Sequence, residues 1–270
     1  MVPMIDMDAS LEHGVTEFYD KLAPDYDAMT GFEKRFVHER PFFRMLVEKH
    51  GIRTALDAGC GTGFHSLLLA RLGVEVTAVD ISPNMLAIAG AHAKEMELPL
   101  HLVESSFQSL PTLAPGPYDA VFTMGNSLAH LLTKEDLERS LAAFAAVLPP
   151  LGVLFLQNLN YDRIMEKKEH IQSVKEGGDA TYIRSYEYGN ELIHFQILKL
   201  VHQGPNVVHA LNTVNLRPVL HGELVEMLGT AGFDDIKTYG SVSMEEFQVQ
   251  SSRDLVVLAS KQGSASRSSG

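Results

Sequence analysis

Apolar positions follow two different periods along the chain. From residue 54 to about 261, short β-rich runs alternate with segments of helical spacing. Helix-and-strand alternation of this kind is typical of a mostly parallel sheet covered by helices. We therefore expect an α/β fold with strands at 54–58, 74–79, 100–103, 118–124, 153–157, 236–239 and 255–259, and helices at about 64–72, 83–97, 134–148 and 222–231.

The pattern differs before this core and again within it. Near the N-terminus, Phe18, Leu22, Tyr26 and Met29 have helical spacing but are interrupted by Pro24, which predicts two short helices, followed by a firmer helix at about 40–50. Later, residues 181–217 contain three long β-like stretches, broken at 189–190 and at 203–206. This second region predicts an antiparallel meander inserted in the α/β unit.

Charge and cysteine content exclude several classes of protein. The 270 residues carry 22 Lys and Arg against 34 Asp and Glu, a net charge of −12, which counts against binding of nucleic acid. No apolar stretch approaches the roughly 20 residues of a membrane span. The single cysteine, Cys60, has no partner for a disulfide, and the first residues do not resemble a secretory leader. We expect a cytoplasmic protein.

The strongest chemical signal is a glycine-rich loop between a strand and a helix. Asp57 lies near the end of the strand at 54–58, the loop Gly59-Cys60-Gly61-Thr62-Gly63 follows, and Asp80 closes the next strand. Glycines let a ligand approach the backbone, and an acidic residue about 20 positions later can accept hydrogen bonds from a ribose. A dinucleotide fingerprint needs a further glycine where Phe64 or Ser66 stands, so an NAD(P) oxidoreductase is disfavoured.

These residues resemble two motifs of the class I S-adenosylmethionine (SAM)-dependent methyltransferases, the first at 57–63 and the second at 80–86. Over nearly the whole chain the sequence is similar to the glycine and sarcosine N-methyltransferases, with local matches at 61–66, 125–131 and 160–164. The resemblance implies a Rossmann-like seven-stranded sheet. From the resemblance together with the residue patterns, we expect an N-terminal helical lid (1–50), a SAM-binding core (51–158), an inserted β-rich substrate cover (159–217) and a return to the core (218–261). Residues 262–270 are rich in Ser and Gly and are expected to form a disordered tail.

The same resemblance implies which residues hold SAM and its product S-adenosylhomocysteine. Tyr19 and Tyr26 would be aromatic lid residues, although helix packing is the alternative role for at least one of them. Phe107 would pack on the adenine, with core packing as its alternative. The complete expected set is Tyr19, Tyr26, Asp57, Gly59, Cys60, Gly61, Gly63, Phe64, Asp80, Ile81, Met85, Ser106, Phe107, Met124 and Gly125.

The methyl acceptor is expected to be a small molecule, most simply an amine. By the resemblance Asn126 and His130 face it, and we expect Tyr161 and Tyr182 to line its pocket. The family's carboxylate-binding arginine is replaced by Leu159, so amino-acid specificity is in doubt unless another arginine reaches the pocket. The candidates for that role are Arg163, Arg184 and Arg217.

Three alternatives remain open from the sequence. A small-molecule O-methyltransferase or an amino-sugar N-methyltransferase would share every SAM residue, and a non-catalytic SAM-binding regulatory protein would keep them while lacking the acceptor arginine. The meander is a candidate surface for a homo-oligomer. His194, His202 and His209 lie on neighbouring predicted strands but lack the tight spacing of a metal site, so no metal is expected.

Overall fold

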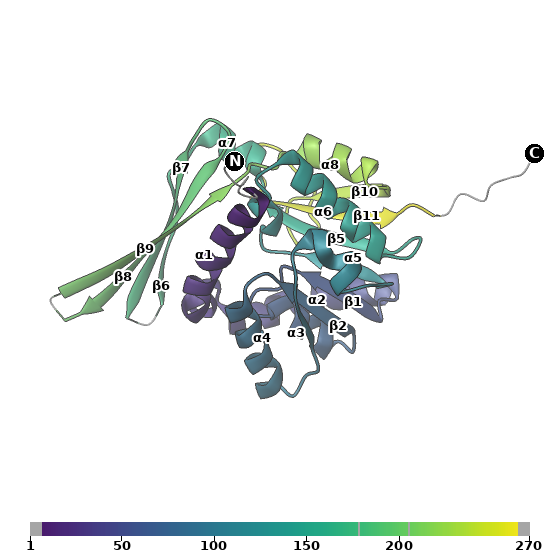
Figure 1. The fold of residues 1–270 in the computed structure, drawn as a ribbon, viewed down its shortest axis with the longest axis horizontal. Coiled ribbons are helices and arrows are strands. Elements are labelled where there is room, and N and C mark those ends of the chain that lie inside the picture. The colour runs from purple at the N-terminus through teal and green to yellow at the C-terminus, as the bar shows by residue number, and fades with distance from the viewer. Residues whose placement is uncertain (1–6, 178, 205, 264–270) are drawn as a thin grey trace, which may run out of the picture.

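The computed structural model describes residues 7–177, 179–204 and 206–263 and confirms the α/β architecture (Figure 1). Seven strands form one sheet in the order β10-β11-β5-β4-β1-β2-β3, in which β11 alone runs antiparallel to its neighbours. The bounds are β1 Thr54–Ala58, β2 Glu75–Asp80, β3 His101–Glu104, β4 Ala120–Thr123, β5 Val153–Leu159, β10 Phe233–Tyr239 and β11 Asp254–Lys261. Of the tail predicted at 262–270, residues 264–270 lie outside the described ranges.

Apolar helix faces bury both sides of this sheet. Helices α2 (Phe32–His50) and α3 (Phe64–Arg71) share a cluster of buried side chains with one side of the central strands. Helices α5 (Leu110–Leu113), α6 (Lys134–Val147) and α8 (His221–Thr230) share a second cluster with the other side. Fully buried Leu56 and Val121 belong to the second cluster, and Ala55 and Phe122 to the first, as the two-residue period of a strand requires.

Two helices begin where the sequence predicts them. Helix α4 (Pro83–Glu95) is capped by Ser82, whose hydroxyl accepts a hydrogen bond from the Met85 N–H at 3.1 Å. Helix α6 is capped by Thr133, which accepts from the Asp136 N–H at 3.0 Å. The short 3₁₀ turns η1 (Phe107–Ser109) and η2 (Ser127–His130) follow β3 and β4 on the side where the parallel strands end.

The prediction of two short N-terminal helices is wrong. One helix, α1, runs from Met7 to Thr30 with Pro24 inside it, and α2 likewise begins earlier than expected and contains Pro41. Proline removes the N–H that would bond to the carbonyl four residues earlier. In α1 that carbonyl belongs to Asp20, and the Asn84 side chain donates to it instead at 3.4 Å. Tertiary packing thus compensates the break that the local sequence predicts.

The inserted meander has four strands and not the predicted three. Strands β6 (Ile171–Gly177), β7 (Ala180–Tyr188), β8 (Ile193–Gln203) and β9 (Asn206–Leu216) form a separate antiparallel sheet that projects from the body beside α1 (Figure 1). The sequence of β6 is polar and largely exposed, so it lacks the apolar alternation that reveals a strand. Helix α7 (Tyr161–Lys167) connects β5 to this sheet.

Candidate active site

A pocket of about 360 Å³ opens where the parallel strands end. Its floor comes from the residues that follow β1, β2, β3 and β4, and its roof from α1. Ligand sites of open α/β sheets lie at this edge. The lining consists of Val15, Tyr19, Tyr26, Gly59, Gly61, Asp80, Ile81, Ser106, Phe107, Gln108, Ser109, Met124, Gly125, Ser127, His130, Leu131, Leu132, Asp136 and Arg139.

Ten of the fifteen residues expected to hold SAM therefore line one pocket. Of the other five, four lie in the glycine loop or directly beside it in the sequence, and Met85 lies on α4. The buried Asp57 accepts a hydrogen bond from the Ser66 hydroxyl at 2.5 Å and so fixes the loop to α3. Cys60 and Met85 are buried, Gly63 caps α3 with a positive φ of 86°, and Phe64, the first residue of α3, packs on Phe36 of α2. The four residues at 57–64 therefore shape the loop, and Met85 packs in the core.

Asp80 is held in place by backbone donors. One carboxylate oxygen accepts from the Gly61 N–H at 2.8 Å, and the other accepts from the Ser82 N–H at 2.9 Å. Burial raises the pKa of this carboxyl to about 6, although the backbone hydrogen bonds from Ser82 and Gly61 oppose the shift. The glycine loop therefore has at its rim a carboxyl group, that of Asp80, which is ionised at neutral pH and becomes protonated near pH 6.

This pKa predicts a pH dependence of ligand binding. Hydrogen bonds donated by a ribose diol favour the ionised carboxylate, so the affinity for SAM is expected to be full above pH 7 and to fall as the pH drops through about 6. Isothermal titration calorimetry between pH 5 and 8 measures this directly. The Asp80→Asn variant serves as the control because it cannot ionise. A dissociation constant that does not change across this range in the wild type would contradict the role of Asp80.

The pocket roof is attached to the floor by two aspartates of α1. Asp20 accepts from the Ser82 hydroxyl at 2.6 Å, at the start of α4. Asp27 accepts from the Thr62 hydroxyl at 2.7 Å, inside the glycine loop. These bonds place Tyr19 and Tyr26 over the loop, and the Tyr26 ring lies 3.7 Å from where a Cβ on Gly61 would stand. The sequence offered no sign of these partnerships, which span 35 residues or more.

A third aspartate of the same helix holds the meander. Asp25 accepts from the Tyr182 hydroxyl at 2.9 Å and from the Lys199 ammonium at 2.6 Å. Tyr182, expected to line the acceptor pocket, is not among the lining residues and joins β7 to α1 instead. Burial and the Asp25 carboxylate raise the pKa of Tyr182 to about 12, so its hydroxyl stays a donor.

His130 and Tyr19 form a polar pair inside the pocket. The Tyr19 hydroxyl lies 2.8 Å from Nε2 of His130, and the two rings meet edge to face at 5.2 Å. Burial lowers the pKa of His130 to about 4 and raises that of Tyr19 well above its usual value. Both groups are consequently neutral near pH 7.

Asn126 shapes the site without lining the pocket. Its amide NH₂ donates to the Tyr161 hydroxyl at 2.8 Å, and its carbonyl oxygen accepts from the Leu159 N–H at 3.1 Å. Tyr161 is fully buried and lies with Tyr186 in the cluster that joins α1 to the meander. Asn126 and Tyr161 therefore link the turn after β4 to the end of β5.

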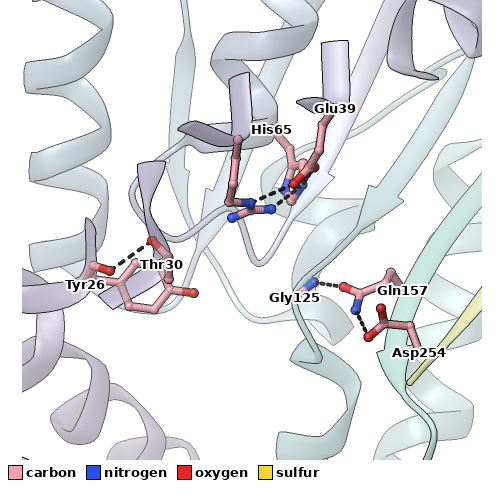
Figure 2. A network of polar contacts seen from close by, with 8 residues as sticks. Tyr26, Thr30, Glu39, His65, Gly125, Gln157 and Asp254 are labelled. Carbon is pink, nitrogen blue, oxygen red and sulfur yellow. Dashed lines mark hydrogen bonds and ion pairs between the residues drawn. The ribbon is translucent and has the colours of Figure 1, made fainter. Parts of the chain in front are cut away.

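A second polar network supports the same turn (Figure 2). The Gln157 carbonyl accepts from the Gly125 N–H at 2.7 Å, while its NH₂ donates to Asp254 of β11 at 2.9 Å. Figure 2 also shows Glu39 and His65, which meet at 3.2 Å and join α2 to α3. Burial raises the pKa of Glu39, but hydrogen bonds and charge from His65 and Arg35 outweigh it and set the value at about 2.

Two of the three candidate arginines are engaged elsewhere. Arg217 pairs with Glu223, and Arg163 lies 3.9 Å from Glu169. Arg184 on β7 has no ion pair with any residue that the structure describes. Its positive charge nevertheless lowers the pKa of Tyr19, Tyr26 and Tyr186 against the effect of their burial. Arg184 thus lies within electrostatic reach of the pocket roof.

Within the described ranges, no three His, Cys, Asp or Glu side chains gather as a metal site would require. The same part of the chain holds no helix with the length and apolarity needed to cross a membrane.

Comparisons with known proteins agree with this geometry. Residues 55–152 match the model of a methyltransferase domain. The chain is 31% identical over 231 residues to the glycine/sarcosine N-methyltransferase of Parasynechococcus marenigrum. The matched region covers 85% of this chain and 80% of the relative. The chain belongs to this family of SAM-dependent methyltransferases. A second such enzyme, from Aphanothece halophytica, is 30% identical over 234 residues, with 85% of this chain and 84% of the relative covered.

The fold of the methyltransferase is likewise that of class I enzymes. A SAM-dependent methyltransferase from Clostridium acetobutylicum superimposes with a TM-score of 0.75 at 18% identity, covering 91% of this chain and 99% of that one. The cofactor of this methyltransferase is SAM, as predicted from the glycine loop. The disfavoured NAD(P) oxidoreductase is excluded by the same family membership.

Proposed function

We propose that this methyltransferase transfers the methyl group of SAM to the nitrogen of a small amine that also carries an anionic group. The observation that carries the proposal is the neutral Tyr19–His130 pair in the pocket that contains Asp80. Relatives named glycine/sarcosine N-methyltransferases support a nitrogen acceptor.

The pocket residues fit SAM by their chemistry. Asp80 offers a carboxylate to the ribose diol, Phe107 offers a ring face for the adenine, and Gly59 leaves its backbone open to the ligand. A Cβ on Gly59 would stand 2.7 Å from the Ser127 hydroxyl and 3.3 Å from the Phe107 ring, so only glycine fits between these side chains. When bound, SAM supplies a methyl group already activated on a sulfonium, which leaves alignment and exclusion of water to the protein.

Tyr19 and His130 are assigned the orientation of the amine. When Tyr19 donates its proton to Nε2 of His130, the tyrosine oxygen keeps its lone pairs for an N–H of the acceptor. The burial that keeps His130 neutral also disfavours an ammonium in the same place, so the amine would be held with its lone pair free. Asn126 is assigned a positioning role through Tyr161 and Leu159.

The same pair argues against oxygen as the acceptor. An alcohol must lose its proton during transfer, and an imidazole whose pKa is about 4 is a poor base for that step. A neutral amine needs only orientation, because its proton is lost after the new bond has formed. This comparison favours N-methylation over the O-methyltransferase alternative.

Arg184 is assigned to the anionic group of the acceptor. Its guanidinium lacks an ion-pair partner among the described residues and acts electrostatically on both roof tyrosines, Tyr19 and Tyr26. Such a group can bind a carboxylate or phosphate through two parallel hydrogen bonds. It would take the place of the family arginine that Leu159 replaces.

A methylation screen tests both parts of the proposal. Labelled SAM is offered to paired amines with and without an anionic group and to hydroxyl compounds, and the products are identified by mass analysis. Arg184→Met is expected to raise KM for the anionic amine about 10- to 100-fold, the loss of one charged hydrogen-bonded contact, and to leave the uncharged analogue unchanged. Arg71→Met, on the far end of α3, is the control for loss of a surface charge.

The outcomes separate the alternatives. Equal effects of Arg184→Met on both amines would remove Arg184 from acceptor binding and leave N-methylation intact. Methylated hydroxyl compounds would establish the O-methyltransferase. SAM binding with no transfer to any compound would favour the regulatory protein.

A further inference from the structure

The outer half of strand β9 is exposed on both of its faces. Asn206 and the five residues after it are all exposed, and three large apolar side chains among them, Val207, Val208 and Leu211, have 53%, 51% and 56% of their surface accessible. Adjacent strand residues point to opposite faces of the sheet. Apolar side chains are therefore open to solvent on both sides of the same short segment.

The other half of β9 is covered. Val214 and Leu216 are 8% and 1% exposed and belong to the buried cluster that includes Val15 and Phe18 of α1. Exposure thus begins where the strand leaves the body of the protein, in the projecting part of the meander (Figure 1).

This segment is also an unpaired sheet edge. The small sheet has the order β6-β7-β8-β9, so β9 pairs with β8 on one side, and no strand of the described ranges pairs with its other side. Edge strands of natural proteins are usually protected by charged side chains, proline or a covering element, because their free N–H and C=O groups recruit other strands. Residues 206–212 contain no charged side chain and no proline.

The opposite edge of the same sheet does carry such protection. Strand β6 contains Lys175 and Glu176, and the Lys175 ammonium donates to the Met29 carbonyl of α1 at 3.1 Å. The two edges of the same sheet therefore differ, because β6 carries charged side chains and the outer half of β9 does not. A free edge without charge or proline is the kind that another β-strand can pair with.

We propose that two copies of this chain pair through the outer edges of β9, antiparallel about a twofold axis at His209. In this register Val207 faces Leu211, Val208 faces Ala210, and Asn206 faces Asn212 of the second copy. The two four-stranded sheets become one sheet of eight strands. Since each chain carries a net charge of −12, contact along an uncharged segment is the arrangement that brings no like charges together.

The pairing has a consequence for the pocket roof. Strands β7 and β8 carry Tyr182 and Lys199, which both bind Asp25 of α1. A second copy on β9 restrains β8 through the eleven paired positions of the β8–β9 ladder, from Gln203↔Asn206 to Ile193↔Leu216. The dimer would accordingly hold the meander against α1.

Mass measurement by light scattering after size-exclusion chromatography tests the dimer. The wild-type chain is expected to elute with the mass of two chains, and Val207→Lys/Leu211→Lys with the mass of one, since in this register each added lysine directly faces an added lysine of the second copy. Val174→Lys, at a β6 position that is 60% exposed, should leave the dimer intact. Circular dichroism and SAM binding verify that each variant is folded. A monomeric wild type, or a dimer that survives the double substitution, would overturn the proposal.

A cysteine substitution tests the register. Directly opposed residues of antiparallel strands have Cα atoms about 4.5–5.5 Å apart, which is within the range of a disulfide. His209→Cys is expected to form a cross-linked dimer under mild oxidation, because position 209 faces itself across the axis. Ile171→Cys on β6, the other edge of the sheet, is the matched control. The natural Cys60 is buried and is not expected to form a cross-link. Cross-linking at 171 and not at 209 would rule out the β9 interface.

Discussion

Substitution of Asp80 with alanine is expected to raise the dissociation constant for SAM by about 100-fold or more. The carboxylate is assigned the ribose diol and also accepts the Gly61 N–H at 2.8 Å, so its loss removes a ligand contact and loosens the loop together. A hydrogen bond to a charged group contributes about 1.5–3 kcal/mol, and two such losses correspond to two orders of magnitude or more in affinity. Isothermal titration calorimetry with SAM and S-adenosylhomocysteine measures the change.

Asp119 provides a matched control for this experiment. Like Asp80 it accepts two backbone N–H groups, those of Arg53 at 2.8 Å and Thr54 at 3.0 Å, but it does so where β1 begins, at the opposite edge of the sheet. Asp119→Ala is expected to lower the melting temperature and to leave the SAM dissociation constant within about threefold of wild type, the usual result for independent sites. Unchanged affinity in Asp80→Ala would refute the assigned role of Asp80.

Substitution of His130 with alanine is expected to lower kcat/KM for the amine by about 100-fold, the order of loss that follows when a reacting group is misplaced by about 1 Å. Without the imidazole, the Tyr19 hydroxyl loses its partner at 2.8 Å and no longer has a fixed direction. Tyr19→Phe should show a loss of similar order, and the double variant should be no worse than the poorer single one, because the two residues act as a pair. Steady-state kinetics with the acceptor found in the screen provide the numbers.

His194→Ala is the control for this pair. His194 lies in the meander, where its Nδ1 is 2.7 Å from the Asn215 side chain, and it does not line the pocket. Its kcat/KM is expected to stay near wild type. Wild-type turnover in His130→Ala would contradict the role of His130 in orienting the amine. Weakened SAM binding with normal turnover would instead assign His130 to cofactor binding.

The core of the fold follows from local sequence. Strand periodicity, the glycine loop and the capping residues Ser82 and Thr133 are short-range signals, and the structure confirms the elements that they predict. The helix that contains Pro24 and the polar strand β6 could not be predicted in the same way. In each case contacts made after folding outweigh the local preference, as with the Asn84 side chain that bonds to the Asp20 carbonyl.

The candidate site divides in a similar manner. The positions of Asp80 and His130 follow from the rule that parallel strands deliver ligand contacts at their carboxyl ends. The attachments of the roof do not, because Asp25 meets Tyr182 and Lys199 across 157 and 174 residues. Three aspartates spaced along an amphipathic helix resemble an ordinary solvated face, and only the folded chain shows that each has a partner on another element.

The last strand has a bearing on how the protein is made. Every residue that lines the pocket lies between positions 15 and 139, yet the turn at Gly125 is supported through Gln157 by Asp254 on β11. Strand β11 also fills the place between β5 and β10. A chain still emerging from the ribosome therefore holds all of its pocket residues before β11 can support the turn at Gly125, and full affinity for SAM is expected only once β11 has joined the sheet.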